Sequence, residues 1–132
     1  VGLYGYPIVN TQAFRTEGFM TIPGAELHAG AMENGEIWHI LAVGLPEDFA
    51  PSNTPDFEAR DDQESGADLA ARAREAGAFV AVAHPEWSGL STSDARMIEA
   101  AHAVEVYNHG CAVGCDRGHG FYTADQLAGG GW

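Results

Sequence analysis

Residues 78–85, with the sequence AFVAVAHP, constrain the fold of this chain more than any other stretch. The first six are apolar at every position, which is typical of a strand that is covered on both faces in a parallel sheet. Pro85 ends that strand, because proline has no backbone N–H to donate to a neighbouring strand. His84 therefore lies at the carboxyl end of a buried strand, where parallel α/β folds place their binding and catalytic groups.

Three further segments are predicted to be strands. Residues 19–29 and 36–45 are rich in strand-forming residues and are joined by a turn at 30–35. Residues 103–107 follow a predicted helix. The order strand, helix, strand with short connections predicts a right-handed parallel crossover from the strand at 78–83. Together these segments predict an α/β fold.

Capping signals locate the helices. The capping-box pattern at 65–68 predicts a helix that runs to about residue 76. A second such pattern at 91–94 precedes an apolar helical face that extends to residue 101. The remaining segments are predicted from their composition: an acidic, proline-rich loop at 46–63, a glycine-rich loop at 110–120 and a short helix at 122–127.

The length and the charge limit the size of the fold and the partners. A chain of 132 residues can form one domain, whereas a complete α/β barrel typically needs about 250 residues. We therefore expect residues 1–132 to be a single, incomplete domain. The chain has six arginines, no lysine and 19 acidic residues, and its net charge of −13 repels nucleic-acid phosphates and anionic lipids. Neither a broad nucleic-acid-binding face nor a membrane partner is expected.

The two cysteines, Cys111 and Cys115, do not make a disulfide framework. A cytoplasmic protein with reduced thiols is expected, and secretion stays open because we expect the true N-terminus to lie upstream of Val1. The cysteines lie between His109 and His119, and these four residues form a weaker candidate site for structural zinc. Their C-x3-C spacing departs from the usual C-x2-C knuckle.

Three polar residues interrupt the apolar strands: Glu26, His39 and His84. Burying a carboxylate and two imidazoles without partners costs several kcal/mol, so their placement requires a compensating group. A divalent metal ion would supply one, and nitrogen and carboxylate ligands without thiolate suit zinc, manganese or iron. In the alternative, Glu26 pairs with an arginine and each histidine with a backbone carbonyl. The metal hypothesis predicts that the three side chains converge toward one cavity.

The turn between the first two predicted strands tests this hypothesis. A tight two-residue hairpin at Asn34-Gly35 would offset Glu26 and His39 by four residues, about 13 Å along a strand at about 3.3 Å per residue. A wider loop, centred between residues 32 and 33, would set Glu26 directly opposite His39. If one ion binds both residues, Asn34-Gly35 should not form a tight hairpin; otherwise the two residues should bind different ions of a cluster.

Other polar residues are candidates for binding substrate or supporting the metal ligands. His28 projects to the same side of an ideal strand as Glu26, or is an ordinary histidine at the rim of the sheet. Glu105 lies inside the strand at 103–107 and could accept hydrogen bonds from metal ligands or pair with an arginine. Asn108 follows that strand, where it could bind a substrate oxygen or shape a turn. Arg117, in the following loop, is a candidate phosphate-binding residue.

Four segments in this order resemble the polymerase-and-histidinol-phosphatase (PHP) superfamily of metallohydrolases: IPGAE at 22–26, WHIL at 38–41, VAHP at 82–85 and VEVYN at 104–108. The resemblance covers nearly the whole chain. Members fold as a distorted seven-stranded β/α barrel and bind two or three divalent ions, commonly zinc, manganese or iron, at the carboxyl ends of the strands. It implies that the chain is part of such a distorted (β/α)7, TIM-like barrel.

The resemblance also assigns roles to residues. Glu26, His39 and His84 match metal ligands of the family by motif, and Asn108 matches a recurrent residue whose role the motif does not define. The opening His-x-His, the Thr-Asp-His and the closing Asp-x-His motifs of the family have no counterpart here. The chain is therefore expected to be the central part of such a domain, and to be inactive by itself because it lacks part of the site.

The implied activity is metal-assisted hydrolysis of a small-molecule phosphoester. A hydroxide whose pKa is lowered by the bound ions would attack phosphorus, so that no protein residue acts as the nucleophile. Two alternatives remain: hydrolysis of a carboxyl ester or carbamate on the same fold, or a noncatalytic scaffold domain. A nearby arginine such as Arg117 or Arg15 would favour a phosphate. A pocket lined by Trp87, Tyr107 and Tyr122 would favour a neutral ester.

Overall fold

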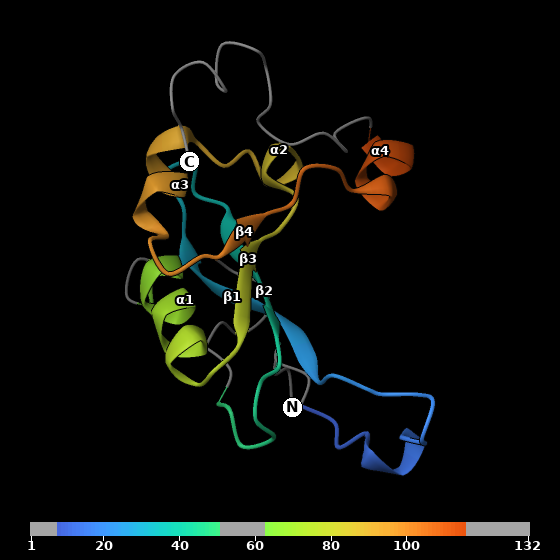
Figure 1. Cartoon of the computed structure of the whole chain (residues 1–132). Coiled ribbons are helices and arrows are strands. Elements are labelled where there is room, and N and C mark those ends of the chain that lie inside the picture. Colours follow the sequence, from blue (N-terminus) through green and yellow to red (C-terminus); the bar gives the residue numbers. More distant parts are fainter. Residues whose placement is uncertain (1–7, 51–62, 116–132) are drawn as a thin grey trace.

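The computed structural model describes residues 8–50 and 63–115, which form a small mixed α/β unit (Figure 1). Its strands are β1 (Gly24–Ala31), β2 (Ile37–Val43), β3 (Phe79–Val82) and β4 (Ala103–Val104). Its helices are the 3-10 turn η1 (Gln12–Phe14) and the α-helices α1 (Gly66–Glu75), α2 (Pro85–Ser88), α3 (Thr92–Met97) and α4 (His109–Cys115). No helix in the described ranges is long and apolar enough to cross a membrane.

The four strands form one open sheet in the order β1-β2-β3-β4. β1 and β3 both pair antiparallel with β2, and only β3 and β4 are parallel. The expected partial (β/α)7 barrel is therefore wrong: the described strands form a mixed sheet that does not close. The physical reason is the connectivity, because a barrel of parallel strands needs a crossover after every strand, whereas β1 and β2 are joined by a hairpin.

The sheet has one covered face and one open face. Alternate side chains of the three longer strands are buried against α1, because successive side chains of a strand point to opposite faces. These residues and their partners on the helix form much of the core: Leu27, Ala29, Ile40, Ala42, Val80 and Val82 from the strands, and Leu69, Ala70 and Ala73 from α1. The opposite face carries the polar residues that interrupt the strand pattern.

β3 differs from the expected strand in a parallel sheet. It lies between an antiparallel and a parallel neighbour, and the expectation that both of its faces are covered is only partly right. Val80 and Val82 are fully buried, whereas Phe79 remains 51 % exposed on the other face. Its ring stacks on His102, whose Nδ1 accepts a hydrogen bond from the Val80 N–H at 3.0 Å.

The β1–β2 hairpin turns over three residues, 33–35. The N–H of Gly35 donates to the Met32 carbonyl at 2.9 Å, and Gly35 has φ +82°, which glycine adopts without steric cost. A bulge at Gly30, whose N–H donates to the Glu64 carbonyl at 2.9 Å, shifts the register next to this turn. Glu26 lies opposite Leu41, two residues from His39. The tight hairpin predicted an offset of four residues and the wider loop an offset of zero, so each of these registers is wrong by two residues.

The helices begin at their predicted caps, and α1 also ends where predicted, whereas α3 is shorter than the sequence indicates. Ser65 accepts a hydrogen bond from the Asp68 N–H and begins α1 as predicted. α3 has the complete capping box of Ser91 and Asp94 but ends at Met97 instead of residue 101. The chain then turns so that β4 lies beside β3, and β4 is two residues long rather than the predicted five at 103–107.

The glycine-rich segment is helical where it is described. Asn108 accepts the Cys111 N–H on its Oδ1 at 2.9 Å, which is an N-cap bond, and α4 begins at His109. The prediction of a loop from residue 110 is therefore wrong as far as residue 115. The rest of that segment, the predicted helix at 122–127 and most of the acidic loop at 46–63 lie outside the described residues.

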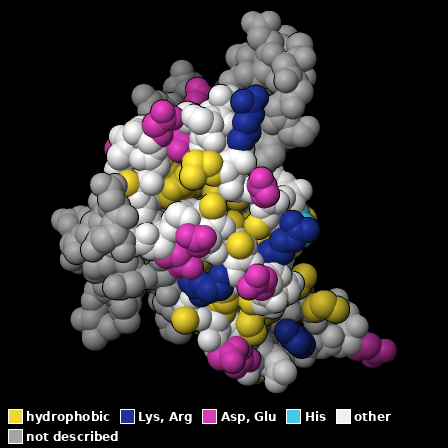
Figure 2. All heavy atoms as spheres, turned by 90° about the vertical axis from the view of Figure 1, so that its left-hand side faces the viewer, with side chains coloured by type: hydrophobic (Ala, Val, Ile, Leu, Met, Phe, Trp, Pro, Cys, Tyr) yellow, Lys and Arg dark blue, Asp and Glu magenta, His cyan; other side chains and the backbone are white. Residues whose placement is uncertain are grey.

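The face that includes α1 carries both signs of charge. Arginine and carboxylate side chains are interspersed there with apolar ones (Figure 2). On α1, Arg72 forms two hydrogen bonds of 2.8 Å to the carboxylate of Glu64. This bidentate pair joins the helix to the segment that precedes it.

We expect Gly66→Ala to destabilise the fold. A Cβ at this first position of α1 would overlap ring atoms of the buried Trp38 indole, so the helix would have to move away from the sheet. Overpacking of this kind typically costs about 1–3 kcal/mol. Urea unfolding measures the loss, and Gly18→Ala is the matched control because a Cβ at Gly18 meets nothing within 4 Å. Equal stability of the two variants would contradict this account of the packing.

Candidate metal centre

Glu26, His28 and His39 meet on the open face of the sheet. Glu26 and His28 are two residues apart on β1, so both side chains leave the strand on the same side. His39 on β2 lies directly opposite His28, and the two imidazole centroids are 4.7 Å apart in an edge-to-face arrangement. The offset of two residues between Glu26 and His39 is short enough for the glutamate side chain to bridge.

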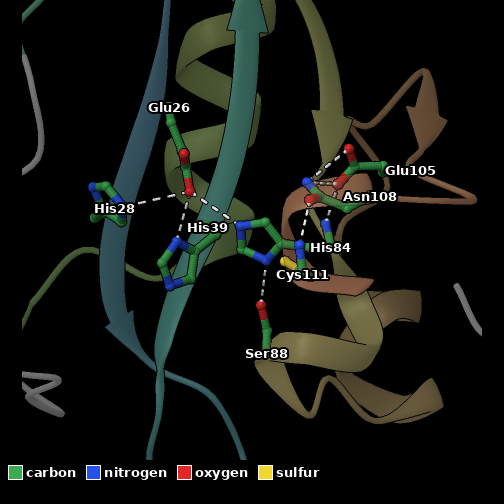
Figure 3. Close-up of polar contacts among 8 residues, drawn as sticks. All are labelled: Glu26, His28, His39, His84, Ser88, Glu105, Asn108 and Cys111. Atoms are coloured by element: carbon green, nitrogen blue, oxygen red, sulfur yellow. Dashed lines mark hydrogen bonds and ion pairs between the residues drawn. The ribbon is translucent and has the colours of Figure 1, made fainter. Parts of the chain in front are cut away.

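His84 completes the cluster from the end of β3 (Figure 3). One oxygen of Glu26, Oε1, lies 2.8 Å from His39 Nδ1 and 3.2 Å from His84 Nε2. His28 Nε2 is further away, at 3.7 Å from the same oxygen. The expected convergence of Glu26, His39 and His84 is thus observed, although it is reached by a different strand register.

The three residues fit a divalent metal ion. One ligand atom from each lies within 4.8 Å of the other two. Ligands at the usual distance of about 2.0–2.2 Å from a zinc ion are separated by distances in this range, and two imidazoles with a carboxylate suit zinc, manganese or iron. The alternative of separate partners does not describe the cluster, because Glu26 is contacted by histidines rather than by an arginine.

Ser88 orients the His84 ring and was not identified from the sequence. Its Oγ lies 2.9 Å from His84 Nδ1, which leaves Nε2 to face Glu26. Pro85 starts α2 directly after His84, and one helical turn then brings residue 88 back beside the histidine. Ser88 is buried. The signal that could have found it is a hydroxyl four residues after the histidine, behind a helix-initiating proline.

Glu105 and Asn108 lie next to His84 rather than in the cluster itself. Glu105 Oε2 accepts the backbone N–H of His84 at 2.7 Å. Asn108 Nδ2 donates to both Glu105 oxygens, at 3.1 and 3.2 Å. The suggestion that Glu105 accepts a hydrogen bond from a metal ligand agrees with this geometry, and the bond comes from the backbone. Arg117 and Tyr122 lie outside the described residues.

Trp87 forms an aromatic wall beside the two histidines. Its ring centroid is 4.9 Å from that of His84 and 5.5 Å from that of His39, and 43 % of the residue remains exposed. Tyr107 contacts His109 instead, with 3.4 Å between its hydroxyl and His109 Nδ1. Trp87 therefore packs directly on two of the candidate ligands.

The second candidate site, at the four histidines and cysteines of residues 109–119, is only partly described. His109 and Cys111 are the first and third residues of α4, and positions two apart on a helix do not face each other. The side chain of Cys115 and all of His119 lie outside the described residues, so a structural zinc site there stays a prediction.

The contacts within the cluster shift two pKa values. Hydrogen bonds from His28, His39 and His84 hold the pKa of Glu26 far below its usual range, although partial burial opposes the shift. Burial lowers the pKa of His39, while its hydrogen bond to Glu26 acts in the other direction. At neutral pH the cluster therefore combines an ionised carboxylate with a neutral His39 imidazole.

No family model, no curated protein and no solved structure matches the chain.

Without metal, the protein should lose stability as the pH falls below about 6.5. The folded state lowers the pKa of His39 from 6.5, so the unfolded chain takes up this proton at a higher pH than the folded protein. The stability contributed by the neutral ring is complete above 6.5 and is lost as the pH falls through the folded-state pKa. The lowered pKa of Glu26 acts with the same sign below 4.5.

Urea unfolding in the presence of a chelator, at pH values on both sides of 6.5, measures this dependence. His39→Gln should reduce the loss of unfolding free energy between those two pH values. An unchanged dependence in the variant would show that His39 does not cause it.

Proposed function

We propose that this chain binds a divalent transition-metal ion through Glu26, His39 and His84 and belongs to a metal-dependent hydrolase. The observation that carries the proposal is the convergence, within 4.8 Å, of one ligand atom from each of three residues that lie on three different strands or strand ends. A bound ion would polarise a substrate carbonyl or phosphoryl oxygen and lower the pKa of a coordinated water.

The side chains around the candidate site supply the ligands, their negative charge and their orientation. Glu26 supplies the negative charge that favours a cation, and His39 and His84 supply nitrogen ligands. Ser88 holds the His84 ring in the orientation that faces Glu26. His28, beside Glu26 and edge-on to His39, adds an imidazole at the border of the cluster, where it can exchange a hydrogen bond with a ligand or a substrate.

A phosphoester is the first candidate substrate, because the motif resemblance points to phosphoesterases. The metal would also allow an anionic ester to approach a chain of net charge −13. A carboxyl ester or carbamate is the second candidate, and Trp87 favours it, since an exposed indole beside the ligands suits an apolar substrate group. Arg72 and Arg74 are engaged on the α1 side, by Glu64 and by the Ala100 carbonyl.

Metal binding is the first test. The chain should bind Zn2+ or Co2+, and Glu26→Ala, His39→Ala and His84→Ala should each weaken the affinity by roughly tenfold or more, because each removes a ligand. Calorimetric titration or the visible absorption of bound Co2+ measures the affinity.

A histidine outside the cluster provides the control for that titration. His102→Asn removes an imidazole but keeps an acceptor for the Val80 N–H, so its affinity should equal that of the wild type. If Glu26→Ala and His84→Ala bind metal as tightly as the wild type does, the proposed centre is wrong.

A substrate panel then separates the three possible functions. With metal bound, hydrolysis of p-nitrophenyl phosphate above the metal-free background supports the phosphoesterase. Hydrolysis of p-nitrophenyl acetate or an aryl carbamate, with a several-fold lower kcat/KM in Trp87→Ala, supports the neutral ester. Metal binding without hydrolysis of any of them supports a chain that is noncatalytic by itself, as the missing motifs imply.

A further inference from the structure

We propose that Glu105, held by Asn108, is a positioning residue that fixes the backbone of His84 and so aims the imidazole at the cluster. The inference rests on the proposed metal centre. It concerns two residues outside the ligand set, which lie on the side of His84 away from Glu26 (Figure 3). Glu105 contacts the backbone of His84, and Asn108 contacts Glu105.

The backbone of His84 needs such a restraint. His84 has φ +20° and ψ +61°, and the other positive-φ residues in the described ranges are glycines. A residue with a Cβ adopts the left-handed region rarely, and persists there only where its surroundings determine the conformation. The conformation matters because it marks the point at which the chain leaves β3 and begins α2.

Glu105 supplies the restraint through a charged acceptor. Its Oε2 lies 2.7 Å from the His84 nitrogen, and hydrogen bonds from an N–H to a carboxylate are among the stronger ones in proteins. The main chain of Glu105 is itself fixed, because its N–H donates to the Val82 carbonyl at 2.9 Å. The carboxylate is therefore anchored to β3 two residues before the histidine that it holds.

Asn108 fixes the carboxylate in turn. Its Nδ2 donates to both oxygens of Glu105, and its Oδ1 accepts the Cys111 N–H at 2.9 Å. The two ends of the amide have opposite hydrogen-bonding character, so these contacts define its orientation without ambiguity. Asn108 thus joins the first turn of α4 to the backbone of a candidate metal ligand.

Glu105 and Asn108 form a clamp on the backbone of His84, whereas the other contacts of His84 involve its ring. Ser88 and Glu26 contact the ring, at Nδ1 and Nε2, whereas Glu105 contacts the main chain. Carboxylates that support metal-bound histidines commonly accept the second ring N–H. Here the hydroxyl of Ser88 takes that place, and the carboxylate sets the direction in which the Cα–Cβ bond leaves the chain.

The test compares Glu105→Ala, Glu105→Gln and Asn108→Asp in the whole 132-residue chain. Glu105→Ala removes the acceptor and should weaken Zn2+ affinity by roughly tenfold or more. Glu105→Gln keeps one acceptor oxygen and should weaken it less. Asn108→Asp keeps the cap of α4 but replaces the donor to Glu105 with a like charge, so it should also weaken the Zn2+ affinity. Glu75→Ala, which removes an exposed carboxylate from α1 on the covered side of the sheet, should bind as the wild type does.

A metal-free measurement separates this inference from the proposed function. In the wild-type protein the short bond to a carboxylate should move the His84 amide proton to low field in 1H–15N spectra, and Glu105→Ala should remove that shift while the signals of α1 stay in place. If the wild type binds no Zn2+, the proposed function fails, and the chemical shift of the His84 amide then tests by itself whether Glu105 holds the His84 backbone. An unshifted wild-type amide, or full Zn2+ affinity in both Glu105→Ala and Asn108→Asp, overturns the positioning role.

Discussion

The pairing of His28 with His39 across β1 and β2 is the constraint on which the candidate site depends. A slip of one residue would turn the side chains of one strand to the other face and bury its polar residues against α1. The register is held at the turn, by the left-handed Gly35 and the bulge at Gly30. With this pairing, Glu26 is close enough to His39 for a bond of 2.8 Å.

Local patterns predicted much of this arrangement, because they depend on neighbouring residues. The cap at Ser65 and the box at Ser91 begin helices as expected, and the polar interruptions at Glu26 and His39 share one face. The register was not predictable in this way, since the bulge at Gly30 is fixed by the Glu64 carbonyl, which is distant in the sequence. The parallel pairing of β3 with β4 and the hairpin of β1 with β2 were predicted, whereas the antiparallel pairing of β2 with β3 was not. The barrel expectation failed because a motif resemblance does not determine which strands pair.

The glycine-rich segment after Asn108 illustrates a competition between composition and capping. Glycine lowers helix propensity, which favours a loop, whereas a single side-chain acceptor at the N-cap satisfies an otherwise unpaired N–H and favours a helix. The cap prevails through residue 115. The same Asn108 side chain also holds Glu105, so one residue both begins α4 and contacts the support of His84.

The protonation of the cluster is compatible with exchange between hydrogen bonds and a cation. When His84 Nε2 faces the ionised Glu26 Oε1, it carries the ring proton and donates a hydrogen bond. To bind a cation, Nε2 must offer a lone pair instead, so the ring proton must then be on Nδ1. Ser88 Oγ can serve both tautomers, because a hydroxyl donates to a bare Nδ1 and accepts from a protonated one. The backbone bond to Glu105 is unaffected by this change, since it involves the main-chain N–H. His84 can therefore change its role in the cluster without giving up either of the contacts that orient it.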